Sequence, residues 1–312
     1  MKKQLGTAFS FAGAVIGAGM MTGAEIGKYF GTGRGTVFTI GLASVIIAFL
    51  LYILTSYASR QGIVELKDLG ASLFGKHAVF FNIFVYICIV SCCGAMLAGI
   101  GELLLVIFHI PSFITSAIVA ILGSLIAYNG ISFVKWVNMI AVPVIMVFVF
   151  VLLFFKGDHG HGMLQHPYKS LIFSIYNVAF ALPLCCSINE KRKVLRNAFV
   201  IFGIIIFTVM LSISMVIPSS GISELPLFDA VLSISDGIVI IYVLCLLSAS
   251  LSTYITSMVG FSQSKPKMLA ASVISYLISL MKIDNIIKYV YPISGILCII
   301  CIVKIIVRGR KI

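Results

Sequence analysis

Charged side chains are scarce in this sequence. Only 10% of its 312 residues are charged and only ten residues are acidic, whereas 61% are hydrophobic. The mean hydropathy is +1.16. So few charges cannot cover the surface of an ordinary soluble domain, so composition excludes that class and indicates a polytopic membrane protein.

The sequence also lacks the features of three other classes. Glu25 and Lys28 follow the first apolar run where a signal peptide would have a small-residue cleavage site, so we expect this run to be retained. No basic soluble segment accounts for the net charge of +12, so we expect no nucleic-acid partner. No nucleophile with an adjacent base and no metal cluster occurs at membrane depth. We therefore expect no enzymatic activity and no cofactor, apart from Na⁺ or H⁺ as a coupling ion.

Apolar segments long enough to cross a bilayer recur along the whole chain, since the hydrocarbon core of roughly 30 Å needs about 20 helical residues. We predict ten spans, at 5–29, 36–58, 77–109, 113–128, 133–155, 168–188, 197–217, 230–261, 267–281 and 286–307. With the N-terminus inside, most of the 22 lysines and arginines fall in inner loops, as cytoplasmic loops require. The prediction is a multi-pass cell-membrane protein, in contact with the lipid bilayer, with both termini in the cytoplasm.

The spans repeat in two halves. Spans that start near 36, 77, 113 and 133 are followed by spans of matching lengths that start near 197, 230, 267 and 286. A unit of five spans ends on the opposite side of the membrane from its start, so the second unit is inverted. We predict an all-α fold with a 5+5 inverted repeat in one transmembrane domain over 1–312, with repeats of about 5–155 and 168–307.

The first and sixth spans, which are partners in this repeat, are both interrupted. Four glycines break the first span in the stretch GAVIGAGMMTG at 13–23, and Asn177 and Pro183 break the sixth. A helix broken in hydrocarbon leaves backbone groups that protein, water or a solute must satisfy. The glycines alone also suit close helix packing. The matched break in the sixth span favours a shared solute site.

This hypothesis assigns residues to the site. A half-helix that begins near Ala18 would attract an anion such as a carboxylate to its positive end. The predicted substrate contacts are the backbone of Gly17, Ala18 and Gly19 and the side chains of Tyr86, Tyr176, Asn177 and Phe180. Ionisable residues inside spans are functional candidates, and Glu25, Glu102 and Asp236 are predicted to gate or relay protons. For Glu25 the alternative is a salt bridge with Lys28, three residues on, and for Glu102 and Asp236 it is capping of a helix end near the interface.

The eighth span carries hydroxyl groups at membrane depth. In LSASLSTYITS, at 247–257, Ala249, Ser252, Thr253 and Thr256 share one helical face. With unwound carbonyls of Gly13 and Ile16, this face could form an oxygen cage for a cation. Serine and threonine also bond back to the preceding turn, so the residues alone leave both interpretations open.

Three of these features together resemble a known transporter superfamily. The run GAVIGAGM, the polar interrupted sixth span and the basic loop NEKRKVLRN resemble the amino acid, polyamine and organocation superfamily. The run from Gly13 to Phe30 is more similar to the YkvI-type bacterial branch, although Ala24 departs from its usual polar residue. The resemblance implies first and sixth helices that unwind around the substrate. Sodium-coupled relatives bind an ion between the first and eighth helices, which implies a sodium site at Gly13, Ile16, Ala249, Ser252 and Thr253.

The sequence therefore predicts a secondary transporter with a small-molecule substrate, an amino acid or a related carboxylate or amine, that works by alternating access. A membrane receptor that keeps the fold and binds a small molecule without carrying it is the alternative. Short inner loops without a soluble domain favour the transporter. A channel is disfavoured because the polar residues cluster near one depth instead of lining a continuous pore.

Overall fold

The computed structural model describes residues 1–155, 166–218, 225–261, 264–281, 286, 289 and 291–309, and within these residues its elements are all helical. The first half contains α1 (Lys2–Val15), α2 (Ala18–Met21), α3 (Ala24–Tyr29), η1 (Arg34–Thr36), α4 (Val37–Gln61), α5 (Leu66–Phe74), η2 (Gly75–His77), α6 (Ala78–Phe108), α7 (Ser112–Ala127) and α8 (Gly130–Phe155). The second half contains α9 (Pro167–Phe180), α10 (Leu182–Ser187), α11 (Arg192–Val216), α12 (Pro226–Leu232), α13 (Asp236–Phe261), α14 (Lys265–Ser279) and α16 (Tyr291–Gly309).

The predicted all-helical class is confirmed. Five described segments are long and apolar enough to cross a membrane: Arg34–Gln61, Leu66–Phe108, Ser132–Phe155, Arg192–Val216 and Gly237–Phe261. Two details differ from the sequence analysis. The eighth span was predicted to start at 230, but residues 230–232 belong to α12, and α13 begins at Asp236. The amphipathic helix α5 was not predicted; it buries Leu66, Leu69 and Leu73, which lie at helical spacing on one face.

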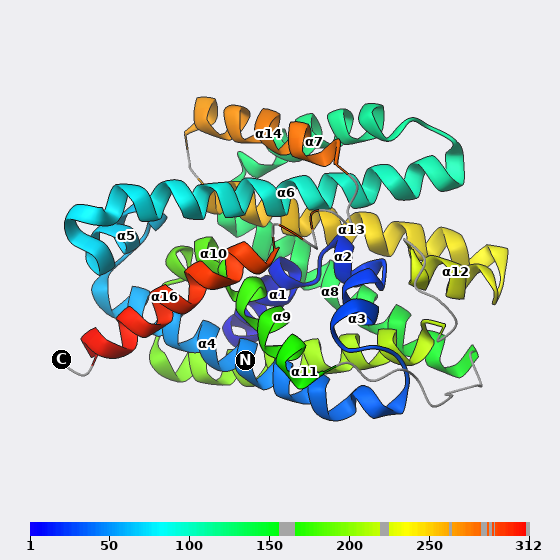
Figure 1. Cartoon of the computed structure of the whole chain (residues 1–312), viewed down its shortest axis with the longest axis horizontal. Helices are drawn as coiled ribbons and strands as arrows, with labels where there is room; N and C mark the ends of the chain where they lie inside the picture. The colour runs from blue at the N-terminus through cyan, green and yellow to red at the C-terminus, as the bar shows by residue number, and fades with distance from the viewer. Residues whose placement is uncertain are drawn as a thin grey trace.

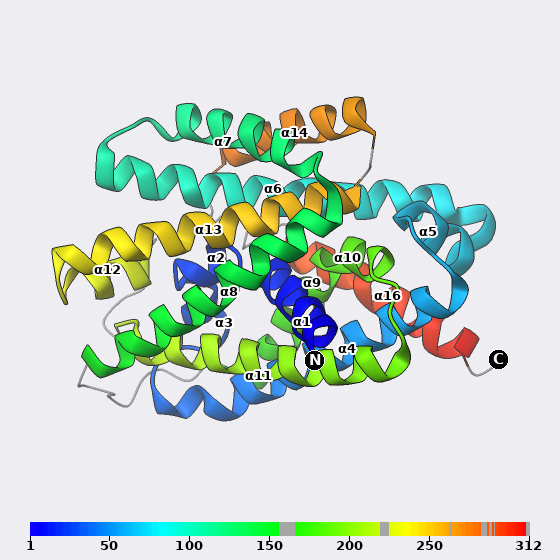
Figure 2. The same ribbon diagram turned by 180° about the vertical axis from the view of Figure 1, so that it is seen from behind.

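The helices form layers (Figures 1 and 2). α7 and α14 lie side by side at one edge and pack on α6, which also packs on α13. At the opposite edge α4 packs against α11. α1 and α9 lie between these layers, where α1 contacts α8, α11 and α13, and α9 contacts α4 and α16. The interrupted first and sixth spans therefore lie inside the helix assembly.

Helical bonding stops twice in the first predicted span. α1 ends at Val15, and Gly17 is extended, with φ −110° and ψ −168°. A second interruption follows α2, where Gly23 has φ +81°, a conformation that side chains with a Cβ rarely adopt. The Thr22 carbonyl accepts a hydrogen bond of 2.9 Å from the Leu227 N–H of α12. The Met21 carbonyl accepts one of 3.1 Å from the Tyr242 hydroxyl. Neighbouring helices thus satisfy backbone groups that the interruption frees.

The sixth predicted span changes helix at Ala181. α9 ends at Phe180 and α10 starts at Leu182, with Pro183 in its first turn, where the missing N–H of proline is tolerated. The Ala181 N–H donates to the Asn177 carbonyl at 3.2 Å. Pro183 also lies directly against Gly260 of α13, where a Cβ would overlap its ring. The position of α10 is therefore fixed by a close approach to α13.

Candidate functional site

The end of α1 meets the hydroxyl groups of α13. Thr253 Oγ1 lies 2.8 Å from the Gly13 carbonyl oxygen, 3.2 Å from that of Ile16 and 3.1 Å from that of Ala249. Ser252 Oγ lies 3.3 Å from the Gly13 carbonyl oxygen. The structure therefore brings together all five residues of the predicted sodium site, and both hydroxyl-bearing side chains are buried.

A sixth residue, Asn138 of α8, joins this oxygen cluster. Its Oδ1 accepts a hydrogen bond from the Ser252 hydroxyl, and its amide lies against Gly13, where a Cβ would overlap it. The side chain is fully buried. Each hydroxyl carries one hydrogen, so the two hydroxyls offer two hydrogens to four nearby oxygen acceptors. Oxygen acceptors therefore outnumber the hydroxyl hydrogens in the cluster, and carbonyl and hydroxyl oxygens are groups that can coordinate a cation.

A buried carboxylate occupies the region between α2 and α3. Glu25 is only 4% exposed, and its Oε2 accepts a hydrogen bond of 3.1 Å from the Tyr176 hydroxyl of α9. The same carboxylate lies against Gly19, where a Cβ would overlap it. The Tyr291 hydroxyl also hydrogen-bonds to Glu25, and the Lys28 ammonium attracts it electrostatically. The predicted backbone contact at Gly19 therefore adjoins an acidic side chain of the protein itself.

Tyr176, which contacts this carboxylate, belongs to a group of packed aromatic rings. The Tyr176 ring centroid lies 5.4 Å from that of Tyr29 and 4.7 Å from that of Tyr291. Phe180 lies 4.8 Å from Tyr291 between ring centroids. The rings come from α3, α9 and α16, and all four are buried. Aromatic rings bind ammonium groups in proteins, and a neighbouring acidic side chain offers such a group an opposite charge.

The other predicted contacts near the first interruption have protein neighbours. The Ala18 N–H donates to Met96 Sδ of α6 at 3.1 Å. A Cβ at Gly17 would lie 2.6 Å from the same sulfur. Asn177 Nδ2 donates to the Phe173 carbonyl one turn earlier, at 3.0 Å. Their roles in substrate binding stay predictions.

Tyr86 lies elsewhere. Its ring packs against Phe261 at the end of α13, with ring centroids 4.7 Å apart, and the charges that act on it are those of Glu65, Lys67 and Asp68 near α5. The structure does not bring it to the Tyr176 cluster. Met96, ten positions after Tyr86 on α6, is the residue that contacts Ala18 at the first interruption.

The other two predicted ionisable residues, Glu102 and Asp236, belong to α6 and α13. Glu102 is partly buried on α6, beside Gly101, which packs against Ser112 and Ser116 of α7. Asp236 begins α13, but its side chain lies outside the described residues. Among the described residues no group of three or more His, Cys, Asp or Glu gathers as a metal site.

The sequence analysis missed Asn138, Tyr291, Tyr29 and Met96. Asn138 offered a signal, because a polar amide in the middle of an apolar span is expensive and is usually placed against polar partners. The two tyrosines offered none, because aromatic residues at membrane depth are most often packing residues. Their role depends on which helices meet, and that is a property of the tertiary fold.

Comparisons with known proteins give two homologues. The chain is 21% identical over 317 aligned residues to the uncharacterized membrane protein YkvI of Bacillus subtilis (strain 168), covering 92% of this chain and 91% of YkvI. It is 23% identical over 313 residues to the uncharacterized protein YyaD of the same organism, covering 91% and 90% of the two chains. No protein-family model matches the chain. The resemblance to YkvI-type proteins is thereby confirmed.

Similar solved structures are secondary transporters. Mhp1, a nucleobase-cation-symport-1 family transporter, superposes with a TM-score of 0.65 at 13% identity over 94% of this chain and 74% of Mhp1. A Na⁺-coupled sialic acid symporter gives 0.63 at 13% identity over 91% and 72%. A manganese transporter of Eremococcus coleocola gives 0.55 at 14% identity over 92% and 69%. At these identities the similarity establishes a shared fold, the LeuT fold of transporters.

Proposed function

We propose that this protein is a secondary transporter of a small solute that carries a positively charged amine, such as an amino acid or a simple amine. The observation that carries this proposal is the buried Glu25 carboxylate inside the interrupted first span, faced by tyrosines of the sixth and tenth spans. A buried carboxylate is costly unless a charge or hydrogen bonds compensate it. The tyrosine hydroxyls and Lys28 supply part of that compensation, and in our proposal an ammonium group on the solute adds to it.

Helix contacts support a 5+5 inverted repeat as the scaffold. α1 packs against α8 and α11, and their counterparts in the second repeat follow the same pattern, since α9 packs against α16 and α4. The short helices α5 and α12, each of which precedes the third span of its repeat, occupy corresponding positions as well. α5 contacts α10 of the sixth span, and α12 contacts α3 of the first. In our proposal the bundle of spans 1, 2, 6 and 7 rocks against the rest around the Glu25 site.

The oxygen cluster between α1 and α13 supports coupling to sodium. Carbonyl oxygens at the C-terminal end of α1 carry the negative end of the helix dipole. The Gly13 and Ile16 carbonyls, the Ser252 and Thr253 hydroxyls and the Ala249 carbonyl then act as cation ligands. In our proposal a bound cation holds α1 against α13, and release of the cation frees α1 to move.

Uptake into proteoliposomes tests the substrate class. The labelled probes are putrescine (amine without carboxylate), alanine (amino acid) and lactate (carboxylate without amine), each with and without a sodium gradient. We expect sodium-stimulated uptake of an amine-bearing probe and its loss in Glu25→Gln. Glu65→Gln is the control and should keep uptake, because Glu65 is an exposed carboxylate just before α5.

Three outcomes contradict parts of the proposal. Uptake of lactate alone would exclude the amine requirement. Full amine uptake by Glu25→Gln would exclude Glu25 as its partner. Binding of the probes without flux, seen by calorimetry on the same preparation, would indicate a receptor in place of a transporter.

A further inference from the structure

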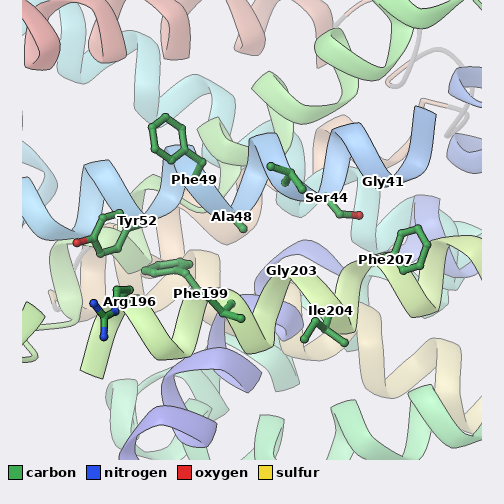
Figure 3. Close-up of a pocket in the computed structure, with 12 residues that line it drawn as sticks. Gly41, Ser44, Ala48, Phe49, Tyr52, Arg196, Phe199, Gly203, Ile204 and Phe207 are labelled. Atoms are coloured by element: carbon green, nitrogen blue, oxygen red, sulfur yellow. The ribbon is translucent and has the colours of Figure 1, made fainter. Parts of the chain in front are cut away.

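An apolar groove runs between α4 and α11, and none of the residues named above for the Glu25 site lines it (Figure 3). It encloses about 590 Å³. Val45 and Phe49 of α4 and Val200 and Ile204 of α11 line it, and each is at least 60% exposed. The lining residues recur at helical spacing along both antiparallel helices, so the groove follows their common axis.

One end of the groove is basic. Figure 3 shows Arg196 of α11 beside Tyr52 of α4 at this end. The Arg192 Nε donates a hydrogen bond of 3.2 Å to the Tyr52 hydroxyl, and Lys193 lies in the same depression. No acidic residue lies in the first turn of α11, and no side chain caps its N-terminus. These three cations therefore stand at a helix end that itself favours an anion.

More positive charge lies next to this end. A neighbouring depression is lined by Lys3, Arg60, Lys191 and Arg192, with Glu190 as its one acidic residue. The positive-inside prediction, with the N-terminus inside, assigns these four basic residues to the cytoplasmic face. The groove therefore meets a cationic surface where the headgroups of the inner leaflet would lie.

The length of the groove matches one leaflet. From Arg196 to Phe207 the lining of α11 advances eleven residues, which is roughly 16 Å at 1.5 Å per residue. Half of a hydrocarbon core of about 30 Å is about 15 Å. A single acyl chain of the inner leaflet fits this span, with its phosphate at the arginines and its methyl end near Gly41 and Phe207.

We propose that this groove is a binding site for an anionic phospholipid. Arg192 and Arg196, with Lys193, hold the phosphate, and one acyl chain lies between α4 and α11. The lipid lies on α4 and α11, and these two helices in turn pack on α9 and α1, which contribute to the Glu25 site and the oxygen cluster. The lipid binds the folded protein and stabilises it.

Native mass spectrometry of the detergent-purified protein, titrated with phosphatidylglycerol or phosphatidylcholine, tests this site. We expect preferential retention of phosphatidylglycerol and a loss of roughly tenfold or more in its affinity in the double variant Arg192→Gln/Arg196→Gln, since each basic residue near an anionic headgroup contributes about 1 kcal/mol. Lys267→Gln, an exposed cation at the start of α14, is the matched control and should retain the lipid.

A second variant tests the apolar lining of the groove independently of its basic residues. Gly41→Leu adds apolar volume at the far end, where a Cβ meets only Phe207, at 3.7 Å. We expect it to weaken phosphatidylglycerol binding while all charges remain. Equal binding by wild type and the arginine variant would overturn the proposal, as would equal binding of both lipids. Inorganic phosphate that stabilises the protein as much as phosphatidylglycerol, in thermal unfolding, would overturn the role of the acyl chain.

Discussion

At the scale of single residues, Gly19 and Glu25 share one small space. The glycine has no Cβ, and the carboxylate fills the position that a Cβ would take. The pair is six positions apart in sequence, so a straight helix would not place the two side by side on one face. The interruption at Thr22 and Gly23 brings them together.

Gly19→Ala should therefore abolish most uptake of an amine-bearing probe, because the added methyl displaces the Glu25 carboxylate. The matched control is Gly6→Ala in α1, where a Cβ meets only Met139 Sδ at an ordinary 3.8 Å. Initial uptake rates in proteoliposomes measure both variants. Equal rates in Gly19→Ala and Gly6→Ala would contradict the placement of the substrate at Glu25.

Thr253→Ala should remove sodium stimulation of uptake, because the Thr253 hydroxyl contacts three carbonyl oxygens of the oxygen cluster. Uptake in the absence of sodium should change much less. Thr208→Ala is the control, since that exposed hydroxyl bonds only to the Ile204 carbonyl of its own helix. Sodium stimulation that survives in Thr253→Ala would rule out this cluster as the coupling site.

At the scale of helices, hydropathy predicted most of the elements. Length and apolar content place spans well because the bilayer sets both. Hydropathy missed α5, whose apolar residues cover one face only, and it merged α12 with α13 because the turn between them is short. The hydroxyl face of the eighth span and the resemblance to sodium-coupled relatives named five residues of the oxygen cluster, and their role in binding a cation stays a prediction. Asn138 and Tyr291 were not found, because their roles depend on contacts between distant helices.

Close helix packing gives a stability prediction at this scale. Gly94 of α6 faces α14, where a Cβ would lie 2.6 Å from Ile278 Cγ2 and 3.0 Å from the Ser275 carbonyl oxygen. Gly94→Ala should destabilise the protein by about 1–3 kcal/mol through overpacking. Thermal unfolding in detergent measures this, with Gly41→Ala as the control at an uncrowded site. An unchanged midpoint in Gly94→Ala would mean that α6 and α14 are further apart.

At the scale of the whole molecule, the charge distribution predicts the orientation in the membrane. Arg34 is exposed between the first two predicted spans, and Asn129 is exposed between the fourth and fifth. In intact cells, a membrane-impermeant maleimide should label Arg34→Cys and spare Asn129→Cys. The seven native cysteines whose side chains the structure describes are buried and should react little with the maleimide. The reverse labelling pattern would place the N-terminus outside.

The hydrogen bond from Leu227 to Thr22 has a mechanical consequence. It ties α12, which the predicted orientation places on the extracellular side, to the turn between α2 and α3. Any displacement of α12 away from this turn must break the bond and let water take its place, at a net cost of about 1 kcal/mol. Movement of α12 is therefore coupled to the turn that places Glu25 beside Gly19.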